Sequence, residues 1–61
     1  MEILKELRNK SGMNQRDMAK ILNISYSHYV KLENNFVNPG FKLIKKIKKE
    51  FPEVDLNRIF K

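Results

Sequence analysis

The sequence predicts an all-α fold, a compact bundle of five short helices in one small domain that spans residues 1–61. Apolar residues recur at the three- and four-residue spacing of a helix face in several successive segments. Residues that end helices, such as Gly12 and Pro52, separate these segments. A chain of 61 residues has room for one such core and excludes a second domain.

The first predicted helix runs from about Glu2 to Lys10. Three aliphatic residues form its apolar face: Ile3, Leu4 and Leu7. Ser11-Gly12 is a signal for the end of a helix, so we expect this helix to stop there and to pack on the segment that follows.

The next segment begins with a capping signal. Asn14 can serve as N-cap of a second helix, and Asp17, three residues later, completes a variant of the capping box. Asn23 predicts the end of this helix, because asparagine tolerates the left-handed conformation that closes helices.

A third helix is predicted to start after a three-residue turn. Ser25 is a good N-cap, and Ile24 and Tyr29 occupy the flanking hydrophobic staple positions. Two helices joined this tightly cross at a steep angle, and Ala19 supplies the small side chain that a close crossing requires. Residues 15–34 are therefore expected to form a helix-turn-helix motif.

This motif resembles that of the Cro and phage-repressor type, also called the XRE family. The resemblance covers nearly the whole chain, from LRNKSGMNQRDMAKILNISYSHYVKLENN through NPG to VDLNRIF. Its most specific points are Gln15, Ala19, the turn, Leu32 to Asn34, and Asn38-Pro39. The chain departs from the family at Asn23 and Asn35, where glycine is usual, and at Tyr29, whose hydroxyl requires a hydrogen-bond partner.

The resemblance implies a lambda-repressor-like DNA-binding domain whose third helix enters the major groove of duplex DNA. Tyr26, Ser27 and Lys31 match the family positions that contact base edges. Val30 lies on the same outward face, where it suits contact with a thymine methyl group. The alternative is an ordinary solvated helix face.

Contacts to the DNA phosphates are expected on either side of the third helix. Asn14 and Gln15 lie at the first turn of the second helix, where unpaired backbone N–H groups attract an anion. The resemblance assigns backbone contacts to Asn34 and Asn38, and Lys42 adds positive charge just beyond them.

In the resembling family, the arginine of the first helix pairs with a glutamate near the end of the recognition helix. Here these residues are Arg8 and Glu33. At 100° per residue Glu33 lies only about 40° from the inward Tyr29, an unfavourable place for an unpaired charge. We expect a structural ion pair, with a solvated Glu33 as the alternative.

The fourth predicted helix runs from Phe41 to Phe51 and is ended by Pro52. Its apolar stripe consists of Leu43, Ile44, Ile47 and Phe51, and its outer face is rich in lysine. Binding to a membrane surface is not expected, because the core uses this stripe. Asp55 then caps a last short helix from Leu56 to Lys61.

Three further apolar residues lie outside these stripes. Phe36 and Val37, in the polar loop before the fourth helix, either fold back on the core or form a contact with a second subunit. Phe60 remains for packing or for the same dimer contact.

The formal net charge of +6 suits a polyanionic partner. Between Met18 and Lys49 a single acid, Glu33, stands against seven lysines: Lys20, Lys31, Lys42, Lys45, Lys46, Lys48 and Lys49. There is no cysteine, and a lone histidine, His28, is weak evidence for a metal site. His28 is a candidate phosphate contact, although an ordinary surface position explains it more simply.

The sequence thus predicts a non-enzymatic protein with no cofactor, metal or small-molecule ligand, located in the cytoplasm of a prokaryotic or phage-type system. The expected function is sequence-specific binding to double-stranded DNA and regulation of transcription, most simply repression by a homodimer on a palindromic operator. The alternative is a protein-interaction module, an antitoxin or anti-repressor, on the same fold. Nonspecific nucleic-acid binding is a third interpretation.

Overall fold

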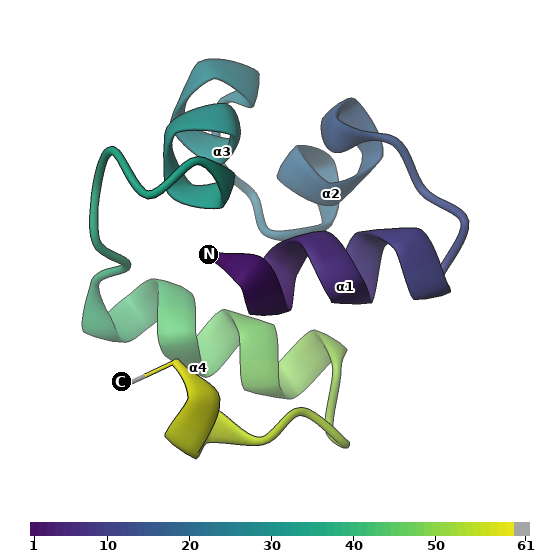
Figure 1. Cartoon of the computed structure of the whole chain (residues 1–61), viewed down its shortest axis with the longest axis vertical. Helices are drawn as coiled ribbons and strands as arrows, with labels where there is room; N and C mark the ends of the chain where they lie inside the picture. The colour runs from purple at the N-terminus through teal and green to yellow at the C-terminus, as the bar shows by residue number, and fades with distance from the viewer. Residues whose placement is uncertain (60–61) are drawn as a thin grey trace.

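The computed structural model describes residues 1–59, which form four α-helices and a 3-10 helix (Figure 1). The elements are α1 (Glu2–Lys10), α2 (Gln15–Ile21), α3 (Tyr26–Glu33), α4 (Phe41–Glu50) and the 3-10 helix η1 (Leu56–Arg58). In Figure 1, α2 and α3 lie on one side of the molecule, α4 and η1 on the other, and α1 between them. The predicted all-α class is confirmed.

Local hydrogen bonds start α2 and α3 where the sequence indicates. The side chain of Asn14 accepts a hydrogen bond from the Asp17 backbone N–H at 2.8 Å, and the Asp17 carboxylate accepts one from the Asn14 N–H at 3.3 Å. The Ser25 hydroxyl accepts a hydrogen bond from the His28 N–H at 3.1 Å. Both predicted caps are confirmed, and each satisfies N–H groups that the helix itself leaves unpaired.

Two asparagines close these helices in the left-handed conformation. Asn23 has φ 58° and Asn35 has φ 64°. After Asn23, the Ile24 N–H donates to the carbonyl of Ala19 at 3.0 Å, and after Asn35, the Phe36 N–H donates to the carbonyl of Lys31 at 2.8 Å. Each bond joins an N–H to the carbonyl five residues earlier, as in the Schellman motif that closes many helices. That motif normally has glycine in the left-handed position, so asparagine takes the place of glycine at both helix ends.

The core lies between the four α-helices, each of which contributes at least one fully buried side chain. Its fully buried side chains are Leu4, Met18, Tyr29, Leu32 and Ile47. Ala19 of α2 is also buried, and α2 packs against α3. None of the helices among the described residues has both the length and the apolar character needed to cross a membrane.

The predicted last short helix starts at Leu56 after Asp55 as expected, but it is not an α-helix. Over the described residues this segment is the 3-10 helix Leu56–Arg58, in which the Arg58 N–H donates to the carbonyl of Asp55 and the Ile59 N–H to that of Leu56. The Asp55 carboxylate accepts from the Asn57 N–H, two residues on, at 3.0 Å. This local bond favours a tight turn over an α-helical start. The predicted extension to Lys61 lies outside the described residues.

Candidate nucleic-acid interface

The outward face of α3 presents the residues predicted to contact bases. Tyr26, Ser27 and Lys31 are exposed, and Val30 is half-buried. Ser27 and Lys31 are four residues apart, so their side chains project from one face one helical turn apart. The hydroxyl and the ammonium group are hydrogen-bonding groups suited to the edges of base pairs.

Tyr26 is held by two residues of α2. The guanidinium carbon of Arg16 lies 4.4 Å from the centroid of the Tyr26 ring, and the Tyr26 hydroxyl donates to Gln15 Oε1 at 3.4 Å. The first contact is a cation–π interaction, whereas the second is a long, weak hydrogen bond. Together they tie the start of α3 to the start of α2.

Arg16 was not predicted from the sequence. It adds a positive charge to the exposed surface beside Tyr26. One signal could have identified it: a cation in the first turn of a helix faces the positive end of the helix dipole and costs the helix stability. A residue that is unfavourable for its own helix is a candidate for another role.

Glu33, at the end of α3, accepts hydrogen bonds from side chains of α1, α2 and α3. Arg8 Nε and Nη2 of α1 donate to Glu33 Oε2 and Oε1 at 3.0 and 3.2 Å. The Tyr29 hydroxyl of α3 donates to Oε2 at 2.6 Å, and Gln15 Nε2 of α2 donates to Oε1 at 3.2 Å. The Glu33 side chain is only 6% exposed. The structure thus brings Arg8 and Glu33 together, and it supplies the partner that the Tyr29 hydroxyl requires.

The ionisation of this network follows from its contacts. Burial alone would raise the pKa of Glu33, but hydrogen bonds from Arg8, Tyr29 and Gln15 outweigh it, and the pKa is lowered from its ordinary value of 4.5. Burial and the adjacent Glu33 carboxylate raise the pKa of Tyr29. The hydrogen bond to Glu33 raises the pKa of Arg8. At neutral pH the network is therefore a carboxylate held by one guanidinium and two neutral donors.

The residues predicted to contact phosphates fall into two groups. Asn14 and Gln15 lie at the start of α2, where the Asn14 N–H and side-chain oxygen are used by the capping box and Gln15 is shared between Glu33 and Tyr26. Exposed side chains at the start of α3, at its end, and in the segment beyond it make up the second group: His28, Asn34, Asn38 and Lys42.

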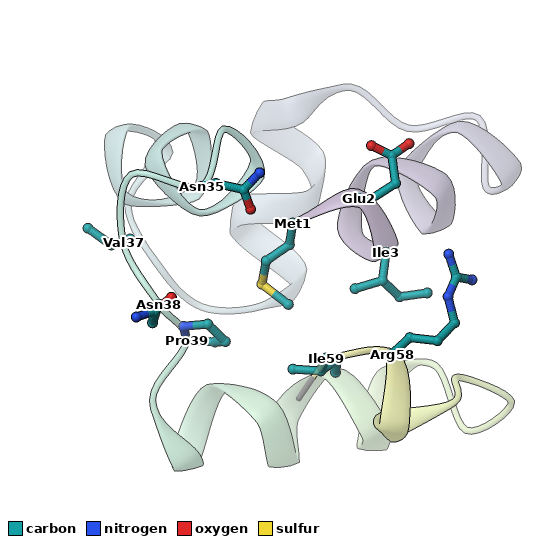
Figure 2. Close-up of a pocket in the computed structure, with 9 residues that line it drawn as sticks. All are labelled: Met1, Glu2, Ile3, Asn35, Val37, Asn38, Pro39, Arg58 and Ile59. Carbon is teal, nitrogen blue, oxygen red and sulfur yellow. The ribbon is translucent and has the colours of Figure 1, made fainter. Parts of the chain in front are cut away.

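The loop residues predicted to pack or to dimerise differ from one another. Phe36 is 77% exposed, whereas Val37 is half-buried and packs against the core. Val37 also borders a pocket of about 190 Å³ between the loop, the N-terminus and η1, together with Asn38 and Ile59 (Figure 2). Val37 therefore folds back and Phe36 does not. Phe60 lies outside the described residues.

Two short helices crossing at a tight turn, with exposed polar side chains on the second, define a helix-turn-helix protein of the DNA-binding class. A family model described as helix-turn-helix matches residues 4–59, and the chain belongs to this family, of the Cro and phage-repressor (XRE) type. The family is one of non-enzymatic DNA-binding domains with the lambda-repressor-like fold. A search of the curated proteins and a search of the solved structures each found no match.

Proposed function

We propose that the protein binds duplex DNA sequence-specifically, with α3 in the major groove, and represses transcription as a homodimer on a palindromic operator. The observation that carries this proposal is the exposed face of α3, where Ser27 and Lys31 project one turn apart while the opposite face is buried. An ammonium group can donate to guanine O6 and N7, and a hydroxyl can donate or accept. Binding to the DNA of a prokaryotic or phage genome would place this action in the cytoplasm.

The test is selection of binding sites from a random duplex pool near physiological salt, followed by sequencing. We expect enrichment of a palindrome with half-sites about 10 base pairs apart, because each domain reads few base pairs and two-fold symmetry doubles the site. Lys31→Ala should relax the preference at one position of each half-site, with a cost of about 1–3 kcal/mol. Lys5→Ala, at an exposed lysine of α1, is the matched control. Binding without enrichment would refute sequence-specific recognition.

Within this proposal, Tyr26, Ser27, Val30 and Lys31 contact bases, and the phosphate contacts are Asn14, Gln15, His28, Asn34, Asn38 and Lys42. Substitutions in these two groups should affect DNA binding differently. Lys42→Ala should weaken binding equally for every sequence and reduce the salt dependence by the release of about one counterion. A change of sequence preference in Lys42→Ala would contradict its assignment to the phosphates.

The homodimer is proposed from the loop between α3 and α4. Phe36 is an exposed aromatic side chain in this loop, and apolar side chains of this kind commonly form subunit contacts. Phe60 belongs to the same proposal. Sedimentation should give a dimer on a two-half-site duplex, and Phe36→Ser should reduce dimer formation. A monomer both free and on DNA would contradict the proposal.

A further inference from the structure

An apolar groove is formed by residues of α4 and η1, two elements that lie on the opposite side of the molecule from α2 and α3 in Figure 1. Its volume is about 400 Å³, and it is bordered by Phe41, Ile44 and Leu56 together with three lysines. Phe41, at the start of α4, is 73% exposed. An aromatic side chain this exposed beside two aliphatic residues is an unfavourable surface in water. Covering it with a partner would remove this apolar surface from water and so be favourable in free energy.

The rim of the groove carries positive charge that the described residues do not neutralise. Lys45 Nζ lies 5.5 Å from the centroid of the Phe41 ring, and Lys49 lies one turn further along α4. Over residues 1–59, the ion pair on α4 is that of Lys46 with Glu50, and neither Lys45 nor Lys49 has a carboxylate within 4.0 Å. Two ammonium groups therefore stand beside an apolar floor and are available for carboxylates of a partner.

The third lysine shapes the groove. Lys48 Nζ donates hydrogen bonds to the carbonyl oxygens of Pro52 and Val54 at 2.5 and 3.2 Å. Its charge is thus directed to the end of α4 while its methylene chain lines the groove. These bonds join α4 to the segment that leads into η1, where Leu56 forms the opposite wall. The groove has a defined shape before any partner binds.

We propose that this groove docks an acidic amphipathic helix of another protein. The apolar side chains of such a helix would enter between Phe41 and Leu56, and its glutamates or aspartates would pair with Lys45 and Lys49. Charge complementarity selects this occupant. A second copy of the chain would bring the same lysines against these in a two-fold contact, and like charges disfavour that arrangement. A DNA phosphate would meet an apolar floor, which does not solvate it.

The groove is formed by α4 and η1, whereas α2 and α3 lie on the other side of the molecule in Figure 1, so a partner in the groove leaves the outward face of α3 free for DNA. The proposal does not depend on DNA recognition, since it rests on α4 and η1 alone. If the protein does bind an operator, the groove would bring an acidic partner to that site. If it does not, the groove remains a protein-binding surface.

The probe is a synthetic helical peptide of about 15 residues, a length near the minimum for a stable isolated helix. It carries a stripe of leucine and phenylalanine flanked by glutamates. Titration of the ¹⁵N-labelled chain, followed by NMR, should shift the amide signals around Phe41, Ile44 and Leu56. A peptide with glutamine in place of every glutamate should bind about tenfold more weakly. Equal binding of both peptides, or no binding of the acidic one, overturns the proposal.

Matched variants locate the site. Phe41→Ser should weaken peptide binding about tenfold. Phe36→Ser, at the exposed phenylalanine proposed for the dimer contact, should leave peptide binding unchanged even where it reduces dimer formation, because Phe36 does not border the groove. The double variant Lys45→Glu/Lys49→Glu should abolish binding, and Lys5→Glu/Lys10→Glu, which changes the net charge equally at exposed positions of α1, should retain it. Equal losses in the two double variants would show nonspecific charge attraction and overturn the proposal.

Two other occupants give different results. If vesicles containing anionic phospholipid shift the groove signals and compete with the peptide in a Phe41-dependent way, the groove binds a lipid surface and the proposal is wrong. If Phe41→Ser converts a dimer of the free chain into a monomer in sedimentation, the groove is a contact between copies, and the proposal is equally wrong. The proposal is supported if Phe41→Ser does not change the oligomeric state, vesicles do not shift the groove signals, and the DNA-bound protein still binds the acidic peptide.

Discussion

Replacing Arg8 by alanine tests what fixes the recognition helix in place. The change removes two charge-assisted hydrogen bonds, at 3.0 and 3.2 Å, from a carboxylate that is only 6% exposed. Removing one partner of a buried pair costs about 3–5 kcal/mol, mostly because the other charge stays buried. Arg8 itself is 17% exposed, so water can partly replace it, and Gln15 and Tyr29 still donate to Glu33. We therefore expect a loss of about 2–3 kcal/mol.

The assay is thermal and urea unfolding followed by circular dichroism. A loss of this size in a domain of this length should lower Tm by roughly 10–20 °C. Lys10→Ala, at an exposed residue of the same helix, is the control and should change the free energy of unfolding by less than about 0.5 kcal/mol.

A double-mutant cycle tests the physical cause. If the cost of Arg8→Ala is an uncompensated carboxylate, then adding Glu33→Gln should recover part of the lost stability, because a neutral amide is cheaper to bury than a charge. The reasoning is refuted if Arg8→Ala costs no more than Lys10→Ala. It is also refuted if the two changes at Arg8 and Glu33 are simply additive.

Three further predictions concern the same half of the molecule. Asn23→Ala should lower the free energy of unfolding by about 1–2 kcal/mol in urea titrations, because alanine resists φ 58°, and Asn23→Gly should not. Ser25→Ala should cost about 1 kcal/mol in the same titrations through loss of the cap on α3, with Ser27→Ala unchanged. Because folding lowers the pKa of Glu33, its contribution to the free energy of unfolding should be complete above pH 4.5 and should be lost as the pH falls further. Because folding raises the pKa of Tyr29, its contribution to the free energy of unfolding should be complete below about pH 10 and should be lost as the pH rises further. Melting curves across pH check both limits, and Tyr29→Phe should remove the alkaline one.

The local features of the fold were predictable because each depends on residues close in the chain. The Asn14 and Asp17 capping box and the Ser25 cap require only a side chain and a backbone group three residues away. The left-handed Asn23 and Asn35 followed from the conformational tolerance of asparagine. In the last segment the predicted cap at Asp55 and the start at Leu56 are confirmed, but the helix is of the 3-10 type, which the short Asp55 to Asn57 hydrogen bond favours and the sequence pattern does not specify.

Features that join separate elements were harder to predict. The pairing of Arg8 with Glu33 came from family resemblance and the helical wheel, but nothing in the pattern placed Gln15 between Glu33 and Tyr26. Arg16 over Tyr26 depends on the crossing of α2 and α3. The exposure of Phe41 depends on the orientation of α4 about its own axis relative to η1. Such contacts are set by the packing of whole helices, which a single sequence specifies only indirectly.

Gln15 links the core of the motif to its outer surface. Its amide nitrogen carries two N–H groups and its oxygen accepts, so one N–H serves Glu33, the oxygen serves Tyr26, and one N–H remains. That remaining donor is the one our proposal gives to a DNA phosphate. Because the same planar amide makes all three contacts, rotation toward the phosphate would move the acceptor of the Tyr26 hydroxyl. In the proposed complex, contact of Gln15 with the DNA backbone would therefore be coupled to the position of Tyr26, the first residue of α3.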